Sequence, residues 1–288
     1  MSAAVSGGRY RLGPRALAGV GVGYAILILL AVIYIYPFLV SVAGSFKTDA
    51  DATQNPLSLL PQTWSFAAYE RLFTEVPLLQ WAGNSTIVTV CITIGRVFFD
   101  SLAGYALSRL RFPGRRIVFA ALIAVLAVPP VALLIPRFLV LKQFGMFDSF
   151  AGMIIPIMID AAGIFIMKQF FDSIPVSVEE AARIDGASVF RTFWSIVLPM
   201  ARPALITLFI LSFQGSWNEF SYFLVARQDA DLHTLTTGVA TLTSGQLGQG
   251  NQFPLKLAAA VLMSIPVAVL FFVFQRRITS TAEGAEKG

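Results

Sequence analysis

The stretch EEAARIDGASVFRTFWSIVLPM, residues 179–200, lies between two long apolar segments of a strongly hydrophobic chain. Glu179 and Glu180 suit the first turn of a helix, where carboxylates face the positive end of the helix dipole. The alanine pair that follows favours a helix, and Gly186 can adopt the left-handed conformation that ends one. The pattern predicts a short helix, a turn and a second amphipathic helix outside the membrane.

The composition of the whole chain is that of an integral membrane protein. Its 288 residues are 56% hydrophobic and only 13% charged, with a mean hydropathy of +0.74, whereas soluble domains are about a quarter charged. The net charge of +5 indicates basic loops at a membrane, because the basic residues do not cluster with aromatic ones as in a nucleic-acid surface. The single Cys91 and the single His233 exclude an intramolecular disulfide, a multi-cysteine metal site and a histidine-ligand cluster. We therefore expect no catalytic residue and no metal ligand.

Six apolar runs are long enough to cross a bilayer. They lie near residues 17–40, 84–108, 117–137, 150–171, 203–226 and 255–275. With the N-terminus inside, fourteen basic residues fall in cytoplasmic segments and six in external ones. This asymmetry follows the positive-inside rule. The sequence thus predicts an all-α membrane protein with six transmembrane helices, both termini in the cytoplasm, and the quoted stretch on the cytoplasmic side.

The fifth predicted span carries an unusual number of polar and aromatic side chains. They are Gln214, Trp217, Asn218, Glu219 and Tyr222. Amides and carboxylates can bond sugar hydroxyls while aromatic rings cover apolar sugar faces. The set is therefore a candidate substrate pathway or gate. The alternative is polar packing between transmembrane helices, or a gate against a partner chain.

Three ionisable residues lie inside other predicted spans, where such groups are costly and usually have a partner. Arg96 and Asp100 are four residues apart, which predicts an intramembrane ion pair on one helix face. Asp160 follows Pro156 by about one turn, and this proline should kink its helix. Asp160 either faces the pathway or pairs with another chain.

The spacing within the quoted stretch resembles a known signature. Its fixed positions are Glu180, Ala181, Ala182, Gly186, Ile196, Leu198 and Pro199. This pattern resembles the signature loop of binding-protein-dependent ABC importer permeases. The stretches AGYALSRLRFPGRR and SWNEF are similar to the carbohydrate branch, close to the second, maltose-type permease. The resemblance extends from about residue 17 to residue 277.

The resemblance implies a type I ABC importer transmembrane domain with coupling helices at residues 176–199. The residues that would contact the ATPase are Glu179, Glu180, Ala181, Ala182, Asp185 and Gly186. The implied parts of the chain are a cytoplasmic tail (1–16), a first helix with an external segment (17–79), the permease core (80–277) and a second tail (278–288).

The implied function is that of a permease subunit in an ATP-driven, binding-protein-dependent sugar importer of the bacterial plasma membrane. No G-x-x-x-x-G-K-[ST] string is present, so ATP and Mg²⁺ are expected on a partner ATPase and no cofactor on this chain. The expected partners are a second homologous permease, a cytoplasmic ATPase dimer, an extracytoplasmic sugar-binding protein and the lipid bilayer, but no nucleic acid. The alternative is a self-contained, ion-coupled secondary transporter, which would need a midplane ion site. A membrane-embedded enzyme is a weaker third class.

Overall fold

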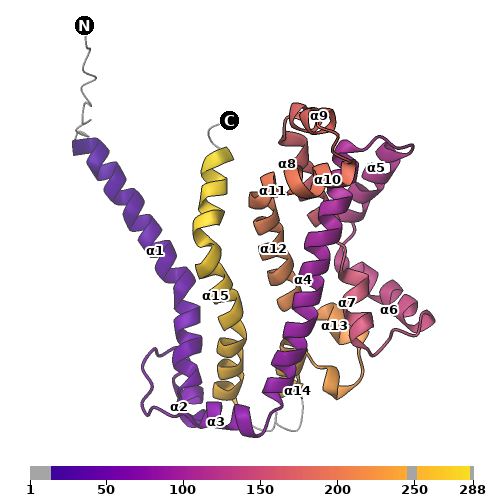
Figure 1. The fold of residues 1–288 in the computed structure, drawn as a ribbon. Coiled ribbons are helices and arrows are strands. Elements are labelled where there is room, and N and C mark those ends of the chain that lie inside the picture. The colour runs from indigo at the N-terminus through magenta and orange to yellow at the C-terminus, as the bar shows by residue number, and fades with distance from the viewer. Residues whose placement is uncertain (1–13, 245–251, 286–288) are drawn as a thin grey trace. The chain divides into compact units, whose positions relative to one another are not determined.

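A computed structural model describes residues 14–244 and 252–285 as a set of helices joined by turns and short loops, with no strand among them (Figure 1). Most of the predicted tail at 1–16, part of the external loop, and the last residues of the predicted tail at 278–288 lie outside the described residues.

Four helical segments are long and apolar enough to cross a membrane. They are Val20–Ser45 within α1 (Pro14–Ser45), α4 (Leu78–Arg109), Phe150–Ser173, and Phe253–Gln275 within α15 (Phe253–Ala285). Two bent pairs, Arg115–Leu126 with Pro130–Gln143 and Val189–Met200 with Arg202–Trp217, pass the same test together, with bends of 104° and 80°. Counting each bent pair as one span gives the six that the sequence predicts, and the all-α membrane fold is confirmed.

Three of the predicted spans are not continuous helices. In the span predicted at 117–137, α5 (Arg115–Leu126) ends just before Pro129 and Pro130, which lack the N–H donors that would continue it. The 3₁₀ turn η1 (Pro130–Leu133) and α6 (Leu134–Gln143) follow.

The span predicted at 203–226 also breaks. α12 (Arg202–Trp217) stops at Asn218, and α13 (Ser221–Ala226) starts anew. Glu219 therefore lies between two helices rather than inside one.

The span predicted at 150–171 is divided by its proline. α7 (Phe150–Ile154) passes into the 3₁₀ turn η2 (Ile155–Ile157), which contains Pro156, and α8 (Ala161–Ser173) follows. Asp160 has an extended backbone, and its Oδ2 accepts a hydrogen bond from the backbone N–H of Gly163 at 3.1 Å. The predicted kink is thus a complete break, and Asp160 caps the second half-helix.

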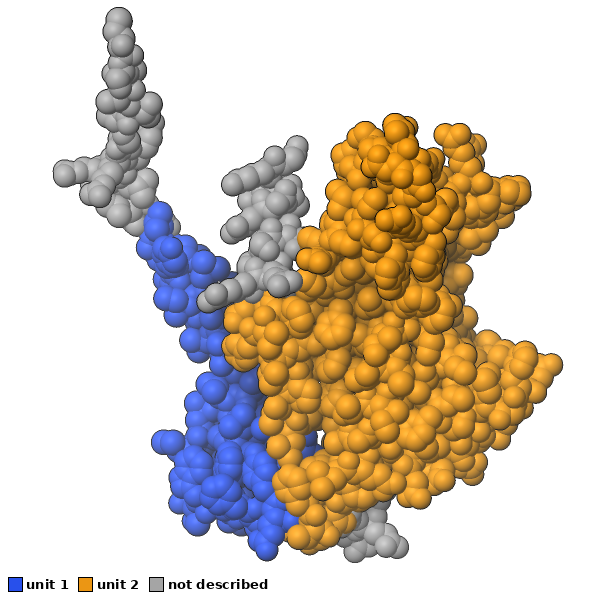
Figure 2. Space-filling model, in the orientation of Figure 1, with its two compact units in different colours: residues 1–70, 251–261 blue, residues 71–250, 262–288 orange. Residues whose placement is uncertain are grey.

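The chain forms two compact units, residues 1–70 with 251–261 and residues 71–250 with 262–288 (Figure 2). In the first unit, α1 leads into α2 (Asp49–Gln54) and the start of α3 (Ala67–Thr74). Buried Lys47 ties the loop between them, because its Nζ donates to the carbonyls of Asn55 at 2.6 Å and Ser58 at 2.7 Å.

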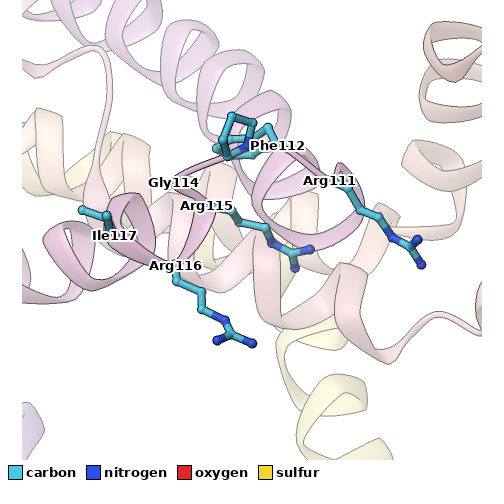
Figure 3. A pocket seen from close by; sticks show the side chains of 7 residues that line it. Arg111, Phe112, Gly114, Arg115, Arg116 and Ile117 are labelled. Atoms are coloured by element: carbon cyan, nitrogen blue, oxygen red, sulfur yellow. The ribbon is translucent and has the colours of Figure 1, made fainter.

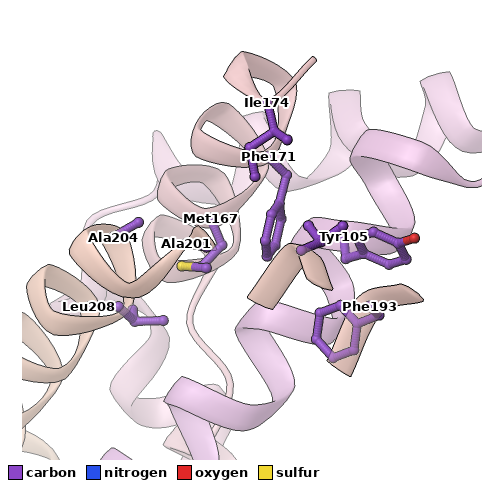
Figure 4. Close-up of a cluster of buried hydrophobic side chains, with 9 residues drawn as sticks. Tyr105, Met167, Phe171, Ile174, Phe193, Ala201, Ala204 and Leu208 are labelled. Carbon is purple, nitrogen blue, oxygen red and sulfur yellow. The ribbon is translucent and has the colours of Figure 1, made fainter. Parts of the chain in front are cut away.

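The second unit is built on α4, which packs against α8 and α12. Gly104 permits the close approach of α4 and α8, since a Cβ there would lie 2.8 Å from the Cβ of Met167. The remaining elements are α9 (Val176–Ile184), α10 (Val189–Thr192), the π-helical turn η3 (Phe193–Val197), α11 (Leu198–Met200), η4 (Ala230–Leu232) and α14 (Leu235–Ser244). Buried side chains from α4, α8, η3 and α12 form one apolar cluster; it includes Tyr105, Met167, Phe171, Phe193, Ala201 and Leu208 (Figure 4).

Candidate functional site

The predicted helix–turn–helix outside the spans is present. α9 begins directly after Pro175 and ends at Ile184. Gly186 has φ 78°, which confirms the left-handed conformation expected of it. The Ser188 side chain then accepts a hydrogen bond from the N–H of Arg191 at 3.3 Å and caps α10. α9 and α10 lie at the same end of α4 as α5 (Figure 1).

The six predicted coupling residues do not share one surface. Glu180, Ala181, Asp185 and Gly186 are exposed on α9 and its turn. Glu179 and Ala182, by contrast, are only 2% and 5% exposed. The exposed residues form the outer surface of α9 and its turn, and the buried ones face the rest of the protein.

Glu179 attaches α9 to the membrane helices through a buried ion pair. Its Oε1 lies 2.9 Å from Nε of Arg109, the last residue of α4. Its Oε2 accepts a hydrogen bond from the Tyr105 hydroxyl at 3.2 Å. The guanidinium of Arg109 also donates to the backbone carbonyls of Phe171 and Ile174 at the end of α8. One arginine thus joins the ends of α4 and α8 to α9.

The apolar cluster packs against this ion pair through Tyr105. The ring of Tyr105 lies 5.7 Å from that of Phe171 and 4.9 Å from that of Phe193, centroid to centroid (Figure 4). Because Phe193 belongs to η3, the second helix of the element rests on the same cluster as the first. α9 and η3 are thus joined to α4 and α8 through packed and charge-paired contacts.

Sequence reasoning missed Arg109 and Tyr105 as site residues. The available signal was their spacing: they are four residues apart at the end of an apolar run, and therefore on one helix face. Their partner, Glu179, is seventy positions beyond Arg109 and could not be paired with it from the sequence.

Besides Asp160, the five candidate pathway residues of the fifth span divide into exposed and buried groups. Gln214 and Asn218 are exposed, and the Asn218 amide donates to the Gln214 carbonyl at 3.0 Å. Trp217 is 5% exposed; its Nε1 donates to the carbonyl of Met263 at 3.0 Å. Buried Tyr222 donates its hydroxyl to the Gly152 carbonyl.

Glu219 has a local task at the break between α12 and α13. Its Oε1 accepts from the N–H of Tyr222 at 2.8 Å, and its carbonyl accepts from the Thr236 hydroxyl at 2.8 Å. The structure therefore leaves Gln214 and Asn218 as the exposed polar pair on this segment and gives Glu219 a capping role.

The predicted ion pair between Arg96 and Asp100 is not among those that residues 14–244 and 252–285 form. Arg96 Nε instead donates to the carbonyl of Ile157 at 2.8 Å. Asp100 Oδ1 accepts from the N–H of Asp160 at 3.0 Å. Arg96 thus binds the carbonyl end of the segment formed by α7 and η2, and Asp100 binds the amide end of α8. Both contacts have the sign that the helix dipole favours. The two residues brace the break in the fourth span.

Two titratable side chains outside the spans have shifted pKa values. They are Asp148, in the turn before α7, and His233, in the loop before α14. Hydrogen bonds from the N–H groups of Gln228 (2.7 Å) and Asp229 (2.8 Å) hold the pKa of Asp148 below its usual value. Burial, chiefly, lowers the pKa of His233 to about 4. The His233 ring lies 5.8 Å from Trp81, and its Nδ1 is 3.2 Å from the Thr237 hydroxyl.

An all-helical chain with several apolar spans and an exposed helix–turn–helix seated on them is typical of a transport permease. The model of the family described as binding-protein-dependent transport system inner membrane component matches residues 100–282, and the chain belongs to this family. It is thus a permease subunit of an ABC importer, and a self-contained secondary transporter is not favoured. Among the described residues, no three side chains of metal-binding type gather in one place.

The relatives are permease proteins of uptake systems. The chain is 35% identical over 252 residues to the diacetylchitobiose uptake system permease protein NgcG of Streptomyces coelicolor, covering 87% of this chain and 83% of that one. It is 31% identical to the arabinooligosaccharides transport system permease protein AraQ of Halalkalibacterium halodurans, covering 89% and 92%. It is 29% identical to the sn-glycerol-3-phosphate transport system permease protein UgpE of Yersinia pestis, covering 89% and 93%.

Two solved structures share the fold. A chain of a bacterial ABC transporter that imports the acidic polysaccharide alginate superposes with a TM-score of 0.81 at 27% identity, covering 92% of this chain and 98% of that one. A chain of the inward-facing MetNI methionine ABC transporter superposes with a TM-score of 0.53 at 19% identity, covering 70% and 95%, and shows the fold alone.

Proposed function

We propose that this chain forms half of the membrane pathway of an ATP-driven importer for a sugar or a sugar derivative. The names of the relatives, which include two for oligosaccharides and one for glycerol-3-phosphate, support this solute class. The other half would be a second homologous permease, and an extracytoplasmic binding protein would deliver the solute. The complex would lie in the bacterial plasma membrane with both termini of this chain in the cytoplasm.

The exposed tip of α9 is the proposed docking element for a cytoplasmic ATPase dimer, which binds the ATP and Mg²⁺. Glu180, Ala181, Asp185 and Gly186 would enter a cleft of the ATPase, where small side chains permit a close approach. No cofactor is assigned to this chain. The observation that carries this proposal is the buried ion pair between Glu179 and Arg109 at 2.9 Å. It gives the docking element a stiff connection to two membrane helices.

The same connection suggests how closure of the ATPase would reach the pathway. A push on α9 acts on Arg109, and through its carbonyl contacts on the end of α8. At the far end of α8, Asp160 and Asp100 hold its N-terminus against α4. α8 is therefore fastened to α4 at both of its ends, and we infer that the two helices move together.

The exposed pair Gln214 and Asn218 is the proposed polar contact of the pathway or its gate. Their amides offer both donors and acceptors, which suits sugar hydroxyls. In this proposal Trp217, Glu219 and Tyr222 position the pair, through the contacts to Met263, to the N-terminus of α13 and to Gly152. Asp160 acts as a cap rather than as a solute ligand.

The proposal is tested by purification and reconstitution. The chain should co-purify with an ATPase and a second permease, and the complex should take up solute only with ATP and the binding protein. Glu180→Gln and Gly186→Ala should uncouple ATP hydrolysis from uptake while the complex still assembles. The control is Asp231→Asn, which changes an exposed carboxylate far from α9 and should leave coupling intact. Uptake by this chain alone, without ATP, would refute the proposal.

A further inference from the structure

An arginine-rich pocket lies between the end of α4 and the start of α5. Residues 111–117 line a hollow of about 730 Å³ (Figure 3). The side chains of Arg111, Arg115 and Arg116 extend to one side of the loop, away from Phe112 (Figure 3). The function proposed above makes no use of this pocket.

The positive charge of the pocket is not neutralised within the chain. Arg115 is fixed to the loop, because its guanidinium donates to the carbonyls of Ser108 at 2.8 Å and Leu110 at 3.4 Å. Arg111 and Arg116 are exposed and form no ion pair or hydrogen bond with any other residue that the structure describes. The sequence from 101 to 147 contains no Asp or Glu. The pocket therefore presents three guanidinium groups to an external anion.

The surface beside the pocket is apolar and exposed. α5 contains no buried residue, and Ile117 and Val118 in its first turn are 75% and 49% exposed. The loop joins α4, which crosses the membrane, to the first half of the next span. The arginines thus lie where a span meets the aqueous phase. A free anion would leave the apolar side chains against water, whereas a lipid covers them with its acyl chains.

We propose that Arg111, Arg115 and Arg116 bind the phosphate headgroup of an anionic phospholipid in the leaflet at this end of α4. The planar guanidinium fork matches phosphate oxygens, and weak hydration suits it to the membrane interface. Each basic side chain near such a surface contributes roughly a factor of five to anionic-lipid binding. The proposal requires only that the loop lies at the membrane boundary, so it stands apart from the solute and from the ATPase.

The test is native mass spectrometry of the purified full-length complex in neutral detergent. Phosphatidylglycerol is titrated against phosphatidylcholine with the same acyl chains. The wild-type complex should bind phosphatidylglycerol more tightly, and R111Q/R116Q should weaken this binding about thirtyfold without changing the binding of phosphatidylcholine. R111K/R116K, which keeps the charge, should retain most of the preference. R191Q removes an exposed arginine of α10 and serves as the matched control, with no change expected.

Three results would overturn the proposal. The first is unchanged binding of phosphatidylglycerol by R111Q/R116Q. The second is displacement of the lipid by inorganic phosphate as effectively as by a short-chain phosphatidylglycerol, which would assign the pocket to a free anion. The third is loss of the co-purifying ATPase from R111Q/R116Q with lipid binding intact, which would assign these arginines to a protein contact.

Discussion

The element formed by α9 and α10 and the break between α12 and α13 both contain residues predicted to be functional, but they bury different kinds of side chain. At α9, the buried polar member is a carboxylate, Glu179, paired with Arg109. At the α12–α13 break, the buried members are the aromatic residues Trp217 and Tyr222, each with a hydrogen bond to a carbonyl. In both places the exposed residues are the ones available to a partner or a solute.

The two regions differ in the free energy that each buried contact contributes to stability. Removing one partner of a buried ion pair leaves an uncompensated charge, which costs about 3–5 kcal/mol. Losing one neutral hydrogen bond costs about 1 kcal/mol. The position of α9 thus depends on the ion pair between Glu179 and Arg109, which tolerates little change. Such a contact suits an element proposed to transmit the closure of the ATPase. The α12–α13 break is held by several weaker contacts.

The largest expected effect is that of Glu179→Ala. Arg109 would remain buried without a countercharge, so the free energy of unfolding should fall by about 3–5 kcal/mol and coupled uptake should be lost. Thermal unfolding in detergent and ATP-driven uptake measure the two effects. Glu180→Ala, at the exposed neighbour, should change stability by no more than about 0.5 kcal/mol. Equal stabilities of the two variants would contradict the assignment of Glu179 as the anchor.

The next effect tests the contact between α4 and α8. A Cβ at Gly104 would lie 2.8 Å from the Cβ of Met167 and 2.9 Å from the backbone nitrogen of Lys168, so Gly104→Ala must push the helices apart. We expect a loss of about 1–3 kcal/mol and weaker coupling. Gly83→Ala in the same helix is the matched control, because a Cβ there meets no atom within 4 Å. If both variants unfold alike, close packing at Gly104 is not what joins α4 to α8.

How much of this architecture the sequence could predict depends on whether its cause is local. The turn at Gly186 and the start of α9 after Pro175 follow from neighbouring residues, and both could be expected. The complete break before Asp160 could not. It depends on Arg96 and Asp100 of α4, which bind the two free helix ends across sixty positions of chain. A spacing of four residues instead suggested that these side chains pair with each other.

The candidate site shows the same limit. The exposed tip of α9 was predicted from its residue types, but the anchoring role of Glu179 was not, because Tyr105 and Arg109 are far away in sequence. In the fifth span, polarity alone could not separate Asn218, which is exposed, from Trp217, which is packed on Phe213 with ring centroids 5.7 Å apart. The prediction from helical spacing requires one continuous helix. Because α12 ends at Trp217, the side chains of Glu219 and Tyr222 do not point in the directions that this helix would give them.

A comparable effect distinguishes the two kinds of residue at this break. Trp217→Phe keeps an aromatic side chain but removes the hydrogen bond to the Met263 carbonyl and part of the buried indole, so stability should fall by about 1–3 kcal/mol. Asn218→Ala should leave stability within about 0.5 kcal/mol but reduce uptake at unchanged complex assembly. Thermal unfolding and transport in the same vesicles separate the two outcomes. Unaltered uptake by Asn218→Ala would remove this residue from the proposed pathway.

The last effect is a pH dependence that vanishes at neutral pH and arises outside both regions. The pKa of His233 is about 4 in the folded chain and about 6.5 when exposed. Between these values the unfolded state binds more protons, so the contribution of His233 to stability falls as the pH falls from about 6.5 to 4 and is constant above 6.5. Unfolding of wild type and His233→Gln, compared across this window, should show a shallower slope for the variant.

A second variant identifies the group responsible. The pKa of Asp148 is lowered by two backbone N–H groups, so its contribution is present above its ordinary value near 4 and is lost only below it. Asp148→Asn should therefore change the pH profile below about pH 4 and leave the slope between 4 and 6.5 as in wild type. If His233→Gln keeps the wild-type slope in that window, the burial of a neutral imidazole beside Trp81 does not contribute to the stability of this loop.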